Sequence, residues 1–133
     1  VLPTDLGYVG NGVRRECRIG AVPTEICAVD IGSETARQYE SIILAAKTVF
    51  VNGPMGIFEQ PETELGTKTV FEALGNTAGY TVVGGGDSVT AAAKYQVKDK
   101  LGYVCTGGGA LIRFLTGEEL PVVKALRHAA AAL

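Results

Sequence analysis

The stretch YTVVGGGDSVTAAAKY, residues 80–95, decides the fold class. The apolar run at residues 80–83 is typical of a buried strand, and the alanine-rich segment after Ser88 is typical of a helix. Three successive glycines join the two, although every glycine costs backbone entropy on folding. A strand that passes through such a turn into a helix predicts one unit of an α/β fold.

The rest of the chain repeats this alternation of strand and helix. Helices are expected over residues 33–46, with Ser33 as the N-cap, and over residues 63–77, 87–96, 108–117 and the tail after Pro121. Strands are expected over residues 48–51, 80–84 and 103–105, with the end of another at residues 1–3, whereas residues 5–27 show no clean periodicity and predict an irregular or partly extended connection. Because the strands are apolar on both faces, we expect a Rossmann-like, three-layer α/β fold: an incomplete parallel sheet of about four strands with helices on both faces.

Composition limits the class of protein. The chain has 133 residues, which is one domain at most, and 47% of them are hydrophobic, which is enough for a real core. A net charge of −2 gives no basic field for nucleic acid, and no apolar run approaches the roughly 20 residues that span a membrane. No signal peptide is visible, so we expect a cytoplasmic protein, and the start at Val1 suggests a piece of a longer one. The three cysteines are expected to be buried, reduced thiols: Cys17, Cys27 and Cys105.

Three strand-to-helix junctions carry the functional signal: VNGPMGIFE (51–59), VGGGDS (83–88) and CTGGGA (105–110). Each follows the carboxyl end of an expected parallel strand, which is the edge where open α/β sheets bind ligands. Glycines let the backbone approach a ligand closely, and the first turn of a helix offers unpaired N–H groups, so the pattern favours a phosphate. Each glycine turn could instead serve packing alone, and neither loop fits a standard phosphate-binding fingerprint.

Asp87 refines the expected ligand. A bare carboxylate would repel a phosphate, but it becomes useful when Mg²⁺ bridges it to phosphate oxygens. Ser88 could donate a hydrogen bond to another phosphate oxygen, and Glu59 could accept hydrogen bonds from ribose hydroxyls. These residues together predict a magnesium nucleotide rather than a bare phosphate.

The order and spacing of VNGPMGIFE, GTKTVFEAL, VVGGGDSVTAA and TGGGALIRFLTGEELP, with DIG before them, resemble the phosphoglycerate kinase family. The resemblance runs from Val1 to about Leu126 and covers the C-terminal part of that family's nucleotide-binding domain. It implies roles for ten positions. The nucleotide phosphates and magnesium fall on Gly85, Gly86, Asp87 and Ser88, with Asp87 as the metal ligand; the ribose falls on Glu59, with Asn52 and Pro54 beside the nucleotide; and the transferring phosphoryl group faces Gly107, Gly108 and Gly109.

The implied activity is that of a glycolytic phosphotransferase with a carboxyl group as acceptor. It exchanges a phosphoryl group between 1,3-bisphosphoglycerate with MgADP and 3-phosphoglycerate with MgATP. The family has two domains, and residues 1–133 match only part of the nucleotide-binding domain, so the substrate domain is absent. We therefore expect the chain alone to lack turnover and to self-associate through uncovered apolar surface. A nucleotide-binding module without catalysis and a purely structural α/β fragment remain as alternatives.

Overall fold

A parallel sheet forms the centre of the computed structural model, which describes residues 1–131. It contains β4 (Thr48–Asn52), β5 (Tyr80–Gly84) and β6 (Tyr103–Cys105) in the order β4-β5-β6. The crossover helices are α2 (Leu65–Asn76) between β4 and β5, and α3 (Gly86–Lys94) with a short 3₁₀ turn, η1 (Lys98–Lys100), between β5 and β6. The Rossmann-like α/β class is confirmed, with three parallel strands, because residues 1–3 are not a strand.

The largest difference from the sequence prediction lies in residues 5–27. They contain an antiparallel hairpin, β1 (Asp5–Gly10) and β2 (Val13–Arg18), and β3 (Asp30–Ile31) pairs with the other edge of β1. The hairpin turn is formed by Asn11 and Gly12, with φ values of 53° and 74°. Asn-Gly is the preferred pair for a two-residue turn that needs positive φ at both positions, so this dipeptide was the signal that the prediction missed.

The start of α1 (Ser33–Ala45) also differs from the prediction. Ser33 is not the cap, because its hydroxyl donates to Glu16. The carboxylate of Asp5, from β1, instead accepts hydrogen bonds from the amides of Glu34 and Thr35 at 3.0 Å and 2.8 Å. A distant strand therefore caps this helix, which no local pattern could reveal.

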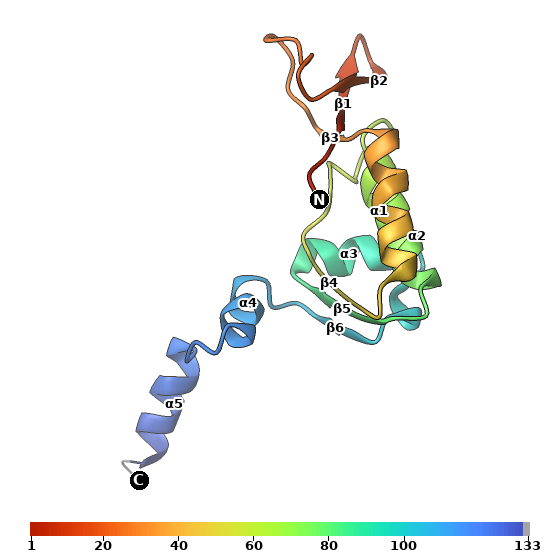
Figure 1. Ribbon diagram of the computed structural model, residues 1–133. Coiled ribbons are helices and arrows are strands. Elements are labelled where there is room, and N and C mark those ends of the chain that lie inside the picture. The colour runs from red at the N-terminus through yellow and green to blue at the C-terminus, as the bar shows by residue number, and fades with distance from the viewer. Residues whose placement is uncertain (132–133) are drawn as a thin grey trace.

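The core lies between one face of the parallel sheet and helices α1, α2 and α3. Register places Val51, Val83 and Val104 side by side on that face, where the fully buried Phe71 of α2 belongs to the same cluster. Helices α1 and α2 pack against each other, and α3 lies along the sheet beside them (Figure 1).

The other face of the sheet is largely uncovered, so the prediction of helices on both faces is wrong for the described residues: α1, α2 and α3 all pack on one face. Phe50, Tyr80 and Tyr103 lie there and are 43–54% exposed. The last two helices, α4 (Gly109–Leu115) and α5 (Pro121–Ala131), extend away from the sheet and contain no buried residue (Figure 1). The expected uncovered apolar surface is confirmed.

Two further points concern single residues and the membrane. The cysteine prediction is wrong in one respect: Cys27 is exposed, and Cys17 and Cys105 are only half-buried. Cys17 lies on β2, the edge strand of the hairpin sheet, Cys27 lies in a loop, and Cys105 lies at the end of β6, so less protein covers them. Among residues 1–131, none of the helices has the length and apolar character that crossing a membrane requires.

Candidate functional site

The three junctions meet at the carboxyl edge of the parallel sheet. Asn52 ends β4, and its side-chain Oδ1 lies 3.0 Å from the position that a Cβ on Gly85 would occupy and 3.6 Å from that of a Cβ on Gly108. The amide of Gly85 donates to the carbonyl of Cys105 at 3.2 Å. The loops after β4, β5 and β6 therefore form one continuous surface, as the parallel topology requires.

Four of the glycines at this edge fall into two groups, whereas a Cβ on Gly107 or Gly108 would make only ordinary contacts at 3.6 Å or more. Gly84 and Gly85 are required by the fold: a Cβ on Gly84 would lie 2.6 Å from Leu111 Cδ2 and 3.0 Å from the Gly107 carbonyl, and Gly85 has φ +98°. Gly86 and Gly109 are different, because a Cβ at either would meet nothing within 4 Å and neither has a positive φ. Packing explains the first group and leaves the second without a structural reason.

Asp87 and Ser88 point in different directions from the first turn of α3. Ser88 is fully buried, and its Oγ accepts a hydrogen bond from the Gly53 amide at 2.8 Å, which ties the β4 loop to α3. Asp87 is exposed and has no hydrogen bond or ion pair with any residue between 1 and 131. Its carboxylate is thus available to a ligand, whereas the oxygen of Ser88 already holds the loop.

Pro54 and Glu59 lie along the segment that leads from β4 to α2. Pro54 borders a largely apolar hollow of about 430 Å³, which Val29, Ile31 and Ile57 also line. Glu59 is exposed, and in the described part of the chain no hydrogen bond or ion pair joins it to the glycine loops. The structure therefore brings Asn52 and the glycines together and leaves Glu59 farther along the same segment.

Two buried residues that the sequence did not single out hold this segment. Thr67 is fully buried in the first turn of α2, and its Oγ1 accepts hydrogen bonds from the amides of Met55 and Gly56 at 3.1 Å and 3.2 Å. Asp30 accepts a hydrogen bond from the amide of Gly66 at 2.9 Å. Only the DIG motif hinted at Asp30, and a threonine inside a helical pattern gives no signal at all.

Asp30 is also the centre of a buried ion pair. Arg14 of β2 reaches its Oδ2 at 2.9 Å, and the Asp30 side chain has no exposed surface. Burial raises the pKa of Asp30, although the Gly66 amide and Arg14 partly offset the effect. The pair lies within the hairpin sheet, because Arg14 is on β2 and Asp30 on β3. Further hydrogen bonds connect it to the neighbouring segment: Arg14 donates to the Glu62 carbonyl at 3.1 Å, and Asp30 accepts from the Gly66 amide.

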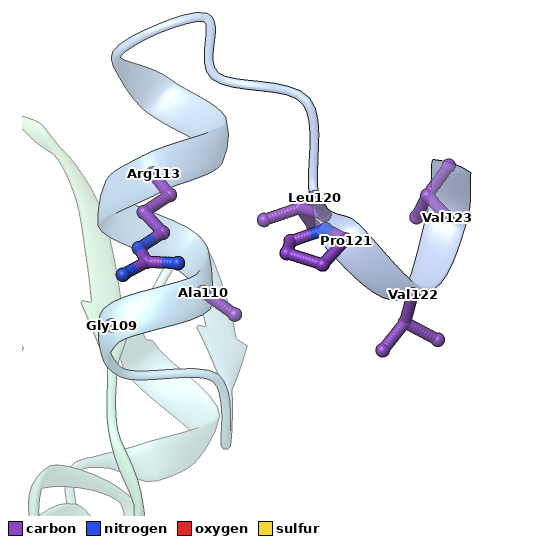
Figure 2. Close-up of a pocket in the computed structure, with 7 residues that line it drawn as sticks. All are labelled: Gly109, Ala110, Arg113, Leu120, Pro121, Val122 and Val123. Atoms are coloured by element: carbon purple, nitrogen blue, oxygen red, sulfur yellow. The ribbon is translucent and has the colours of Figure 1, made fainter. Parts of the chain in front are cut away.

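A second hollow, of about 390 Å³, lies between α4 and the start of α5. Gly109, Ala110 and Arg113 line it from α4, and Leu120 and Pro121 face them across the gap (Figure 2). The lining is mainly apolar, and Arg113 is its charged member.

The residues suit a metal that is shared with a ligand. Within residues 1–131, no group of three or more histidine, cysteine, aspartate or glutamate side chains could hold an ion by itself. Asp87 supplies one exposed carboxylate beside the open space at Gly86. Magnesium commonly takes one or two carboxylates and completes its shell with water and substrate phosphates, so this donor set fits.

Comparison with known proteins identifies the family. The phosphoglycerate kinase family model matches residues 1–118. Among curated relatives, a phosphoglycerate kinase of Roseiflexus sp. (strain RS-1) is 42% identical over an alignment of 133 residues, covering 97% of this chain and 34% of the relative. One from Akkermansia muciniphila is 50% identical over 107 residues, covering 80% of this chain and 27% of the relative.

Solved structures agree. The phosphoglycerate kinase of Coxiella burnetii superposes with a TM-score of 0.83 at 33% identity, covering 93% of this chain and 33% of the other. That of Pyrococcus horikoshii OT3 gives a TM-score of 0.81 at 35% identity, covering 98% of this chain and 33% of the other. The chain spans about a third of the length of the proteins it matches. With its fold, its glycine loops and these matches in agreement, the chain belongs to the phosphoglycerate kinase family.

Proposed function

We propose that this chain forms the phosphate-binding part of a magnesium-nucleotide site. As part of a longer enzyme it would support phosphoryl exchange between 1,3-bisphosphoglycerate with MgADP and 3-phosphoglycerate with MgATP. The observation that carries the proposal is the open space at Gly86 and Gly109, where the fold does not require glycine. A phosphate that approaches the backbone does require it.

Each candidate residue has a distinct task in this proposal. The amides of Gly86 and Ser88 bind nucleotide phosphate oxygens, and Gly85, whose own amide donates to the Cys105 carbonyl, shapes the turn that presents them. Asp87 would hold Mg²⁺, which would neutralise charge on the phosphate oxygens. Asn52 and Pro54 lie beside the nucleotide, and Glu59 accepts hydrogen bonds from the ribose hydroxyls. Their polar groups fix the orientation of the nucleotide before any reaction.

The amides of Gly107, Gly108 and Gly109 face the phosphoryl group during transfer. They stabilise charge on its oxygens and align it with the acceptor. The acceptor is a carboxylate that is already ionised, so the chemistry needs no general base. His128, which is exposed on α5, has no part in it.

The remaining requirements lie outside this chain. We propose that phosphoglycerate binds to a second domain of the full enzyme, that the enzyme works in the cytoplasm, and that the isolated chain has no turnover. A coupled assay that detected family-like turnover from the 133-residue chain alone would contradict the last point.

Calorimetric titration tests the magnesium-nucleotide site directly. The chain should bind MgADP, and both removal of magnesium with EDTA and the substitution Asp87→Asn should weaken ADP binding. Asp99→Asn is the matched control, because Asp99 is also exposed but lies on η1, after α3 has ended. Equal affinity for MgADP in wild type and Asp87→Asn would refute the metal role.

A purely structural fragment is the second candidate. Gly84 and Gly85 favour it, since packing and a positive φ account for both. Absence of MgADP and MgATP binding in the same titration, with the chain folded, would support this candidate over the first.

A further inference from the structure

We propose that Thr67 is a positioning residue for the nucleotide site. Its hydroxyl fixes the segment between β4 and α2, residues 53–64, which carries Pro54 and Glu59 and follows directly from Asn52. The inference rests on the proposed function, since it assigns a task toward the same nucleotide. No motif in the sequence marks Thr67, and it lies inside a helix rather than in a glycine loop.

The contacts of Thr67 are unusual for a helical threonine. Its side chain is fully buried, and the Oγ1 atom accepts from two backbone amides outside its own helix, those of Met55 and Gly56. A threonine in a helix more often bonds a carbonyl of its own preceding turn. Here the hydroxyl instead replaces the hydrogen-bonding partners that an irregular segment lacks.

The same segment is held tightly on its other side. A Cβ added to Gly56 would lie 2.5 Å from Asp30 Oδ1 and 2.7 Å from the Val29 carbonyl, so the backbone there presses against β3 and the residue before it. The amide of Ile57 donates to the same Val29 carbonyl at 3.0 Å. The segment is therefore enclosed between Thr67 and the strand region at Asp30.

The upstream end of the segment leads directly to the glycine loops. Gly53 has φ +98° and donates its amide to Ser88, two residues before the amide that Thr67 accepts from Met55. Loss of the Thr67 hydroxyl leaves the Met55 and Gly56 amides without their partner. Among the described residues, no other side-chain hydrogen bond then holds the segment between Gly53, which is bound by Ser88, and Ile57, whose carbonyl accepts from Thr63.

Thr81 offers a matched control. It is also buried, at 2% exposure, and its Oγ1 also accepts a backbone amide, that of Gly102, at 3.0 Å. Thr81 lies near the amino end of β5, whereas the glycine loops follow its carboxyl end. Valine has nearly the shape of threonine, so Thr→Val at either position removes one buried hydroxyl and little else. A different effect of the two substitutions on the MgADP Kd therefore reflects the location of the hydroxyl and not general destabilisation.

The test compares Thr67→Val, Thr67→Ser and Thr81→Val by calorimetric titration with MgADP and by urea unfolding. Thr67→Val should raise the MgADP Kd about tenfold or more, the size of effect that loss of an outer-shell contact has on metal affinity. Thr67→Ser should stay within about twofold of wild type, because it keeps the hydroxyl. Thr81→Val should lower the unfolding midpoint and leave the Kd unchanged. An unchanged Kd in Thr67→Val, a folded Thr67→Ser with lost binding, or an equal Kd increase in Thr81→Val would overturn the inference.

Hydrogen exchange of the free chain separates this inference from the proposed function. In Thr67→Val the Met55 and Gly56 amides should exchange at least about tenfold faster than in wild type, while the Gly102 amide is unaffected. Should wild type bind no MgADP, the proposed function fails, and with it the nucleotide role of Thr67. Unchanged exchange at Met55 and Gly56 would refute the positioning itself, whatever the nucleotide result.

Discussion

Alanine substitutions at Gly84 and Gly86, two positions in one loop, are expected to have opposite consequences. The Cβ of Gly84→Ala would lie 2.6 Å from Leu111 Cδ2 and 3.0 Å from the Gly107 carbonyl. Leu111 can turn aside, but the carbonyl belongs to the backbone, so we expect the free energy of unfolding to fall by about 1–3 kcal/mol. The Cβ of Gly86→Ala would meet nothing within 4 Å at the first position of α3. Its unfolding free energy should stay the same or rise by up to about 1 kcal/mol, since alanine is the better helix former.

Gly86→Ala should weaken nucleotide binding although it does not destabilise the fold. The added methyl group occupies the space through which a phosphate reaches the backbone, and one lost hydrogen bond to a charged group is worth about 1.5–3 kcal/mol. The MgADP Kd should therefore rise by about 10- to 150-fold.

Urea unfolding followed by circular dichroism, together with calorimetric titration, measures both quantities. Gly20→Ala is the control, because Gly20 has similar open space but lies in a loop after β2. The reasoning would be refuted by a Gly86→Ala chain that is destabilised as much as Gly84→Ala, or by one that binds MgADP as wild type does.

Three further predictions concern stability. Phe71→Ala should lower the free energy of unfolding by about 3–5 kcal/mol, because Phe71 is fully buried, and an unchanged urea midpoint would show that α2 is not packed as described. Burial raises the pKa of Asp5, but hydrogen bonds, chiefly from Thr35, outweigh burial and hold that pKa below the ordinary value. The stability that the Asp5 carboxylate contributes should therefore be present above about pH 4 and disappear as the pH falls further. The melting temperature of Asp5→Asn should therefore fall less steeply with decreasing pH than that of wild type. Identical pH profiles for the two proteins would exclude the cap. The hydrogen bond from Lys94 likewise lowers the pKa of Glu64. Glu64→Gln should therefore reduce the free energy of unfolding at pH 7 and change it little at pH 3. An equal loss at both pH values would contradict the ion pair.

The sequence was most informative where structure is local. The strands at residues 80–84 and 103–105 have the predicted bounds, because continuous apolar runs between glycines leave few alternatives. The convergence of the loops after β4, β5 and β6 followed from parallel topology alone. The Asn11–Gly12 turn is equally local, but hydrophobic periodicity does not predict it because the hairpin is only partly buried.

The rest could not be read locally, because it depends on partners distant in sequence. Asp5 caps a helix that begins at Ser33, and Thr67 holds amides of residues in another segment. The two classes of glycine also look identical in the letters GGGD. Only the neighbours of each Cβ position separate Gly84, which packing requires, from Gly86, which it does not.

Amide chemical shifts during titration of the ¹⁵N-labelled chain with MgADP test the central claim most directly. The account predicts that amides of residues 85–88 and residues 107–109 shift together with one Kd, and that Gly102, at the opposite edge of the sheet, does not respond. Shifts confined to the hollow between α4 and α5, or to only one of the two glycine loops, would contradict it.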